Sequence, residues 1–326
     1  MNEAKILVGD AVQRLKDVPD QSVRTVVTSP PYWGLRDYGN DDQIGLEETP
    51  LDFVEKLCQV FDEVWRVLAD DGTLWVNLGD SYANNGGKTQ PQRDNNGGFG
   101  GSPGTRNQSY SNASGGFERP KTIGGSIKPK DLAGIPWRFA FAMQERGWYL
   151  RQDIIWSKPN PMPESVRDRC TKSHEYIFLM SKSPRYYFDS KAMAEPAIHA
   201  EEKRAGLGRL HYGGKREGAP GTGQENFVSI KEFRNRRSVW NVGVARYAEA
   251  HFAVYPPELI TPCVLAGSEP GDVVLDPFSG SGTTGEVALT HGRDYVGVEL
   301  NPDYAELSEK RIFEAVGMFG NVEVVK

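Results

Sequence analysis

The amino-acid sequence predicts an α/β protein organised around a mostly parallel sheet. Short apolar segments typical of buried strands alternate with segments whose apolar residues recur at helical spacing. Two of these strands run directly into distinctive turns, Ser29-Pro30-Pro31-Tyr32 and the glycine-rich stretch 276–285. With 326 residues, the chain is long enough for one large domain or for one domain with an inserted second.

The first part of the chain alternates strand and helix. Strands are predicted at 5–9, 23–28 and 73–80, and helices at 11–18, with Asp10 as the N-cap, and at 51–68. The helix at 51–68 has the clearest amphipathic pattern in the sequence, because its apolar residues recur every three or four positions. This order is typical of a parallel sheet with helical crossovers.

The same alternation returns twice further along the chain. The predicted elements are a helix at 131–147, strands at 148–156 and 174–182, a helix at 256–267, a strand at 272–276, a helix after the glycine turn, a strand at 294–300 and a helix from Pro302. The segments between them, 84–128 and roughly 182–237, are irregular. The first is rich in Gly, Asn, Ser and Gln, so it is expected to be disordered or to order on a ligand.

Composition narrows the class of protein. The charged fraction of 25% and the hydrophobic fraction of 38% are ordinary for a soluble globular chain. No apolar run approaches the roughly 20 residues needed to cross a bilayer, and the N-terminus has no signal-peptide pattern. Three cysteines and five histidines are scattered, which favours a reduced, metal-free cytoplasmic protein with no membrane partner.

Positive charge is concentrated in the two irregular tracts. Residues 84–130 contain seven Lys or Arg against two Asp or Glu, and residues 182–237 contain twelve against seven. The chain as a whole has a net charge of −6, so its other segments are acidic. Two basic tracts on an acidic body are consistent with a local surface that binds a polyanion, or with solvated loops.

The turn Ser29-Pro30-Pro31-Tyr32 gives up two backbone donors in succession. The prolines end the strand and hold bare carbonyl groups in a rigid backbone, beside a hydroxyl and an aromatic ring. Such a turn could hold a flat group that bears an amino function, or it could be a simple Pro-Pro turn.

The glycine-rich turn after strand 272–276 is typical of a cofactor site. Gly280, Gly282 and Gly285 satisfy G-x-G-x-x-G, and Glu299 ends the next strand about 20 residues further on, so a nicotinamide dinucleotide would also fit. Asp276-Pro277-Phe278 separates these alternatives. A carboxylate at the strand tip disfavours a pyrophosphate and favours S-adenosylmethionine, which carries an ammonium group and a sulfonium.

With both motifs in view, the chain resembles the amino-methylating DNA methyltransferases, which act on cytosine N4 or adenine N6. Thr28-Ser29-Pro30-Pro31-Tyr32 resembles their catalytic motif and residues 276–284 resemble their cofactor motif, in the order of the beta group. The resemblance implies a circularly permuted, Rossmann-like methyltransferase fold. It also implies seven strands, one of them antiparallel, for which 174–182 is the candidate.

The resemblance further implies a role for each motif residue. Ser29 Oγ and the Pro30 carbonyl would hold the amino hydrogens of a flipped base, Pro31 would stiffen the turn and Tyr32 would stack on the base. Segment 251–260 would cover the methionine end of S-adenosylmethionine. The cofactor-binding residues would be Asp276, Pro277, Phe278, Ser279, Gly280, Gly282, Thr283, Glu299 and, near the adenosine, Asp10.

The resemblance also implies an organisation and a partner. A catalytic half at 1–83 would be followed by an insertion at 84–130, the remaining sheet at 131–182, a basic target-recognition region at 183–237 and a cofactor-binding half at 238–326. The partner would be double-stranded DNA, in a bacterial, archaeal or phage-infected cell. A cognate restriction endonuclease on a separate chain is compatible with this reading, and the oligomeric state is left open.

Several alternatives remain at this point. Ser29 before the prolines favours cytosine N4 over adenine N6. A nicotinamide-dependent oxidoreductase would explain 280–299 alone, and a non-catalytic DNA-binding module or an amine of RNA or protein as substrate is also open. Asp80 lines the pocket or caps a helix. The pair Pro262-Cys263, expected for ring-carbon methylation, lies in a predicted helix, so Cys263 is assigned to the core.

Overall fold

A nine-stranded sheet runs through the computed structural model, which describes residues 2–34, 43–83, 127–197, 233–244, 255–317 and 320–326. In spatial order its strands are β11 (Gly320–Val325), β1 (Asn2–Val8), β10 (Asp294–Glu299), β9 (Val273–Asp276), β2 (Val23–Thr28), β3 (Leu68–Leu78), β5 (His174–Ser181), β4 (Tyr149–Ser157) and β8 (Val239–Asn241). Strand β5 is antiparallel to both of its neighbours, and all other neighbouring pairs are parallel. The predicted parallel α/β class and the predicted antiparallel strand are therefore confirmed.

The expected count of seven strands is wrong for the described sheet, which has nine. The two additional strands, β11 and β8, occupy its edges, where unpaired backbone groups accept a further strand. Strand β11 pairs with β1 over six residues, and its Val322 and Val324 pack on the core. A two-residue ribbon of β6 (Glu195–Pro196) and β7 (Phe233–Arg234) was also not predicted.

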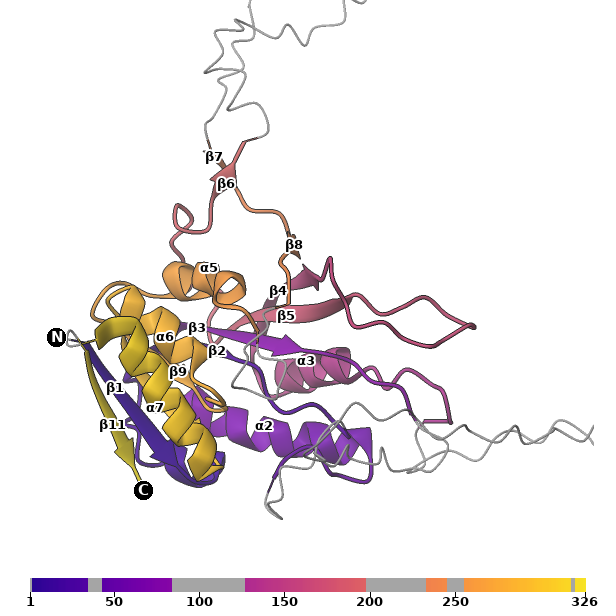
Figure 1. Cartoon of the computed structure of the whole chain (residues 1–326), viewed down its shortest axis with the longest axis horizontal. Coiled ribbons are helices and arrows are strands. Elements are labelled where there is room, and N and C mark those ends of the chain that lie inside the picture. The colour runs from indigo at the N-terminus through magenta and orange to yellow at the C-terminus, as the bar shows by residue number, and fades with distance from the viewer. Residues whose placement is uncertain (1, 35–42, 84–126, 198–232, 245–254, 318–319) are drawn as a thin grey trace, which may run out of the picture.

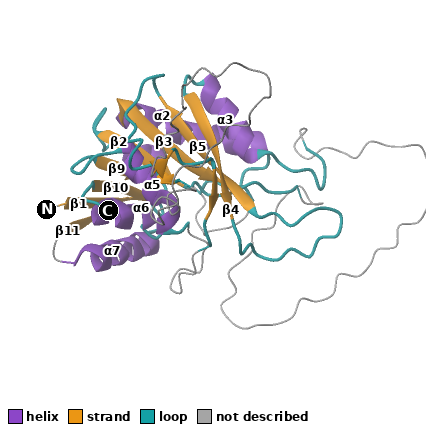
Figure 2. Cartoon of the chain, turned by 90° about the horizontal axis from the view of Figure 1, so that it is seen from above, coloured by secondary structure: helices purple, strands orange, loops and turns teal. Residues whose placement is uncertain are grey.

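Helices cover both faces of the sheet (Figures 1 and 2). On one face are α1 (Ala11–Leu15), α2 (Pro50–Val67) and α3 (Ile135–Glu145); on the other are α5 (Pro257–Gly267), α6 (Thr283–Thr290) and α7 (Pro302–Val316). Successive strand residues face opposite sides, so Val26 packs with the first group of helices and Val27 with the second. The sheet is thus buried on both faces, as its continuous apolar strands predict.

Local sequence signals set the helix boundaries. Helix α2 begins after Thr49, whose hydroxyl accepts a hydrogen bond of 3.1 Å from Asp52 N, and Pro50 occupies the first turn. Helix α3 begins at Ile135 rather than at the predicted residue 131. The cause is Gly134, whose φ of 71° is left-handed. An α-helix cannot include a residue in this conformation, so the helix starts after it.

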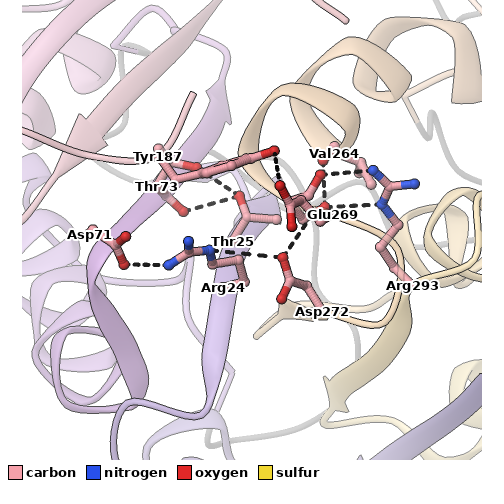
Figure 3. Close-up of polar contacts among 10 residues, drawn as sticks. Arg24, Thr25, Asp71, Thr73, Tyr187, Val264, Glu269, Asp272 and Arg293 are labelled. Atoms are coloured by element: carbon pink, nitrogen blue, oxygen red, sulfur yellow. Dashed lines mark hydrogen bonds and ion pairs between the residues drawn. The ribbon is translucent and has the colours of Figure 1, made fainter. Parts of the chain in front are cut away.

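A polar network ties the amino ends of β2, β3 and β9 together, at the sheet edge opposite the site described below (Figure 3). Arg24 pairs with Asp71 and lies 3.8 Å from Asp272 Oδ2. Thr25 Oγ1 and Thr73 Oγ1 are 2.9 Å apart and buried. These contacts are among neighbouring strand and loop residues, which indicates a structural role.

Two features are absent from the described part of the chain, a membrane-spanning helix and a cluster of metal ligands. None of its helices is long and apolar enough to span a membrane. Within the same residues, no three His, Cys, Asp or Glu side chains cluster as ligands for a metal ion.

Candidate active site

Eight strands of the described sheet have their carboxyl ends at one edge, and the antiparallel strand β5 has its amino end there. Open α/β sheets bind their ligands at this edge. The residues that follow these strands include both predicted motifs. The structure therefore brings the front and the back of the chain into one place.

Strand β2 delivers the turn Ser29–Tyr32 to this edge. Ser29 Oγ donates a hydrogen bond of 3.3 Å to Asn77 Oδ1 at the end of β3, and Asn77 Nδ2 donates in turn to the Tyr176 carbonyl at 3.1 Å. The second bond fixes which way the Asn77 amide points. Because the Ser29 hydroxyl hydrogen is used toward Asn77, its lone pairs are left to accept hydrogens from another group.

The Tyr32 ring is held on two sides. Its hydroxyl donates to Glu175 Oε2 at 2.6 Å, and a Cβ at Gly79 would lie only 2.6 Å from Tyr32 Cε2. Only glycine at position 79 leaves room for the ring where it lies. Both contacts come from elements far along the chain, the end of β3 and the start of β5.

Glu175 itself is paired with a cation. Its second oxygen accepts from Lys158 Nζ, and the Lys158 ammonium lies 4.2 Å from the centroid of the Trp156 ring. The side chains of Lys158 and Glu175 are only 17% and 12% exposed, so solvent screens this pair weakly. Sequence reasoning missed both residues. The signal available was their position, at the end of one strand and the start of its antiparallel neighbour.

The glycine turn joins β9 to α6 with little space behind it. Gly282 has a φ of 80°, and a Cβ there would overlap Ser308 of α7. Ser279 is buried and accepts a hydrogen bond of 2.9 Å from the Tyr295 hydroxyl. Thr283 is buried at the start of α6. At Gly280, by contrast, a Cβ would have its nearest neighbouring atom 3.9 Å away, which leaves open space beside the turn.

Glu299 ends β10 beside this turn. Its oxygens accept from Gly280 N at 2.8 Å and from Asn301 N at 2.9 Å. Burial raises the pKa of Glu299 to about 7, against the lowering effect of these backbone hydrogen bonds. A carboxylate has about four acceptor positions, so these backbone donors leave Glu299 able to accept a hydrogen from a ribose hydroxyl.

Asp10 lies close to Glu299 through the pairing of β1 with β10. Gly9 N donates to the Glu299 carbonyl at 2.9 Å, which places the start of α1 next to the end of β10. The Asp10 carboxylate accepts from Gln13 N at 3.0 Å, so its predicted N-cap role is confirmed.

Asp276 links the two motifs. Its side chain is buried and accepts from Thr28 Oγ1 at 2.6 Å and from Phe278 N at 3.0 Å, both at Oδ1. Oδ2 accepts from Thr284 at 2.7 Å and from the Tyr255 hydroxyl at 3.1 Å. Burial raises the pKa of Asp276, while all four hydrogen bonds lower it.

These contacts place Thr28, the residue before Ser29, and Phe278 on a single oxygen atom. Pro277 is buried behind this link, and the half-buried Phe278 ring packs 6.5 Å from the Phe61 ring of α2. Tyr255 is the first described residue after 245–254 in the segment expected to cover the cofactor, and it lies against Asp276. Residues 251–254 of that segment are outside the described residues, and residues 257–260 form the first turn of α5.

Two open alternatives are resolved by position. Asp80 accepts from Gly134 N at 3.1 Å and from Ile135 N at 3.0 Å, so it caps the amino end of α3. Cys263 is fully buried in α5, and burial raises the pKa of its thiol, which agrees with a core residue. Most of the two basic tracts, residues 84–126 of the first and 198–232 of the second, lies outside the described residues.

The fold and the site together define an α/β enzyme that binds a nucleoside cofactor at the carboxyl edge of its sheet. The residues present fit S-adenosylmethionine, because a carboxylate acceptor, open space at Gly280 and an aromatic ring surround one turn. A family model described as DNA methylase, of the N6/N4 group, matches residues 23–310. The chain belongs to this N6/N4 DNA methylase family.

Individual relatives agree with this assignment. The type II methyltransferase M.Cfr9I of Citrobacter freundii is 48% identical over 96% of this chain and 88% of its own length. M.SmaI of Serratia marcescens is 46% identical over 96% and 91%. A putative DNA modification methylase of Thermus thermophilus, solved with S-adenosyl-L-methionine, is 25% identical with a TM-score of 0.59, over 99% and 100% of the two chains.

The cytosine-N4-specific PvuII DNA methyltransferase shares the fold at a TM-score of 0.60 and 18% identity, over 95% of this chain and 86% of its own. As a member of its family, the present chain is an S-adenosylmethionine-dependent DNA methyltransferase that acts on an amino nitrogen.

Proposed function

We propose that this chain is a type II modification enzyme that methylates cytosine N4 within one specific sequence of double-stranded DNA. The observation that carries the proposal is the shared oxygen of Asp276, which sets the catalytic turn beside the cofactor turn. Ser29 before the prolines favours cytosine over adenine, whose N6 amine is the second candidate target. The two closely similar relatives named above are type II methyltransferases.

The exocyclic amine of a base is a poor nucleophile, and the enzyme must make it attack the methyl group of the cofactor. The lone pair of an exocyclic amine is delocalised into the base, so the nitrogen must be drawn toward tetrahedral geometry. Ser29 Oγ and the Pro30 carbonyl accept the two amine hydrogens, and Tyr32 stacks on the base that has left the helix. Asn77 supports this role because it takes the Ser29 hydroxyl hydrogen and leaves oxygen lone pairs for the amine.

The cofactor residues act by binding and orientation. S-adenosylmethionine supplies an electrophilic methyl group on its sulfonium. Glu299 would accept hydrogens from the ribose hydroxyls, Gly280 would let the turn approach the ligand, and Phe278 would pack beside it. Gly282 would keep the turn in place against Ser308 of α7. Ser279, Thr283 and Pro277 hold the turn in shape, and Asp10 lies toward the adenosine.

Asp276 acts in this proposal mainly through position. Its four donors already enclose the carboxylate, so its charge attracts the ammonium and sulfonium of the cofactor from behind the turn rather than by an open contact. Its hydrogen bond to Thr28 keeps the catalytic turn at a fixed distance from the cofactor turn.

The chain order agrees with a circularly permuted methyltransferase sheet. Strand β1 at the front of the chain lies beside β10 near its end, with Val8 opposite Glu299. In this proposal 1–83 and 238–326 form the catalytic and cofactor halves, 131–182 adds the remaining sheet, and 84–130 and 183–237 contact DNA. A cognate restriction endonuclease on a separate chain is compatible with this function.

The proposal is tested by expressing the chain in a host that lacks it and sequencing the host DNA with detection of modified bases. We expect N4-methylcytosine at one recurring sequence motif. N6-methyladenine at one motif would overturn the choice of base, and no added methyl group would overturn the proposed function.

A Ser29→Ala variant tests the catalytic turn separately. Loss of one acceptor that acts on the transition state is expected to lower kcat by about 100-fold, with an almost unchanged Kd for S-adenosylmethionine. Radiolabelled methyl transfer and calorimetric titration measure the two quantities. An equal loss in both would contradict the role given to Ser29.

A further inference from the structure

The connection between β4 and β5 (residues 158–173) projects from the edge of the sheet that holds the site (Figure 1). Prolines at 159, 161 and 163 alternate with other residues along its first part. This stretch therefore lacks three backbone donors, and φ is fixed at each proline. A proline-rich segment of this kind is extended and stiff. The first arm of the connection is therefore a rigid projection.

The second arm is anchored to the protein. Arg169 pairs with Glu164 at 2.5 Å, and its guanidinium lies 3.9 Å from the centroid of the Tyr82 ring. Lys172 Nζ donates to the Asp80 carbonyl at 2.6 Å. These contacts fix the return of the connection against the loop after β3, so the projection has a defined place.

Met162 is the most exposed large hydrophobic side chain of the described residues, at 85% exposed. It stands between Pro161 and Pro163. Holding an apolar side chain in water on a rigid support gains nothing for folding, because no apolar surface is buried there. Its position on a stiff projection points to a surface that is covered when a partner binds.

The projection starts beside the Tyr32 side chain of the candidate active site. Lys158 and Glu175, at its two ends, pair with each other, and Glu175 accepts from the Tyr32 hydroxyl. Met162 is four residues from Lys158, a span of at most about 14 Å along an extended chain. The exposed Arg167 forms no ion pair with the described residues, which leaves a cation on the same connection for a phosphate group.

We propose that Met162 is a wedge that enters the base stack of duplex DNA next to the target base and fills the space it vacates. Proteins that kink or open DNA insert apolar side chains, methionine among them, between base steps. The inference rests on the proposed function, since a flipped base is needed for the amine to reach Ser29. It adds the residue that stabilises the flipped state, which lies outside both methyltransferase motifs.

The test uses a duplex with the sequence motif identified by methylation mapping, and compares wild type with Met162→Ala. The variant is expected to slow single-turnover methyl transfer about tenfold on the matched duplex, because unstacking is no longer compensated. On a duplex with a mismatch opposite the target base, which costs less to open, its rate is expected to return to within about twofold of wild type. Fluorescence of 2-aminopurine paired with thymine next to the target base, in an otherwise fully matched duplex, should rise on binding to wild type and stay low with the variant.

Two further variants separate a wedge from a general defect. Met162→Leu keeps an apolar wedge and should retain most of the wild-type rate. Phe313→Ala removes another exposed apolar side chain, on α7. It should leave the rate of methyl transfer unchanged on both the matched and the mismatched duplex. A Met162→Ala rate equal to wild type on the matched duplex, or a loss that the mismatch does not rescue, would overturn the inference. Absence of methylation by wild type would instead overturn the proposed function.

Discussion

At the scale of single residues, the site depends on side chains that hold other side chains. Tyr32 is fixed by Glu175 at 2.6 Å, and Glu175 is fixed by Lys158. Neither Glu175 nor Lys158 belongs to a motif that the sequence singles out. In the proposed mechanism both act through Tyr32, which makes them positioning residues.

A Glu175→Ala variant is therefore expected to lower kcat about tenfold while the Kd for S-adenosylmethionine stays unchanged, because the aromatic ring loses its orientation and the cofactor turn does not. Glu175→Gln, which retains an acceptor for the Tyr32 hydroxyl, should recover part of the rate. Glu55→Ala removes an exposed carboxylate that pairs with Arg146 at 2.7 Å and serves as the control. Steady-state kinetics measures the effects, and a loss of cofactor affinity in the Glu175 variants would contradict this role.

The pKa of Glu299, raised by burial to about 7, predicts a pH dependence of cofactor binding. The ribose hydroxyls donate to an ionised carboxylate, and the carboxyl group is protonated below its pKa. Lowering the pH from 8 to 6 should therefore weaken the affinity for S-adenosylmethionine about tenfold. Calorimetry at several pH values measures this change.

The Glu299→Gln variant is the control for that experiment. The glutamine amide does not titrate, so the variant should bind S-adenosylmethionine more weakly than wild type. Its affinity should also lack the change between pH 8 and pH 6 that comes from this carboxyl group. A wild-type affinity that stays constant between pH 6 and 8 would show that the Glu299 carboxylate does not bind the ribose.

At the scale of elements, the end of β2 and the turn after β9 are joined by a buried hydrogen bond. Thr28 Oγ1 and Asp276 Oδ1 are 2.6 Å apart and come from neighbouring strands. The same strand β2 has a second buried threonine hydrogen bond nearer its amino end, between the hydroxyls of Thr25 and Thr73 at 2.9 Å. The chain thus provides a matched pair of positions, one at the site and one remote from it.

Replacing Thr28 by Val removes the donor and leaves the shape of the side chain. We expect a loss of about 1–3 kcal/mol in the free energy of unfolding, because a buried carboxylate oxygen loses a partner, together with a lower kcat. Thr25→Val should reduce the free energy of unfolding with kcat unchanged. Urea denaturation and kinetics on both variants test this, and equal kcat values for Thr28→Val and wild type would contradict the link between the motifs.

At the scale of the whole molecule, much of the fold follows from sequence pattern. The alternation of apolar strands with amphipathic helices predicted a parallel sheet, and β5 was correctly expected to be antiparallel. The edge strands β11 and β8 were missed, because a short strand at an edge depends on a neighbour and not on its own pattern.

The site was predictable in part for the same reason. Residues next to a strand end are found by the rule that parallel strands share a carboxyl edge. The contact of Tyr32 with Glu175 joins residues 143 positions apart, and only strand order brings them together. Asp80 could have been assigned to the α3 cap only once the start of that helix was known.

The central claim is that the carbonyl of Pro30 and the methyl group of the cofactor face each other across the target nitrogen. A crystal structure with sinefungin, which carries an amine in place of the methyl-sulfonium, tests it most directly. We predict that this amine lies within about 6 Å of the Pro30 carbonyl oxygen, which leaves room for one nitrogen about 3 Å from each. Sinefungin bound away from Gly280 and Glu299, or with its amine turned from Pro30, would contradict the account.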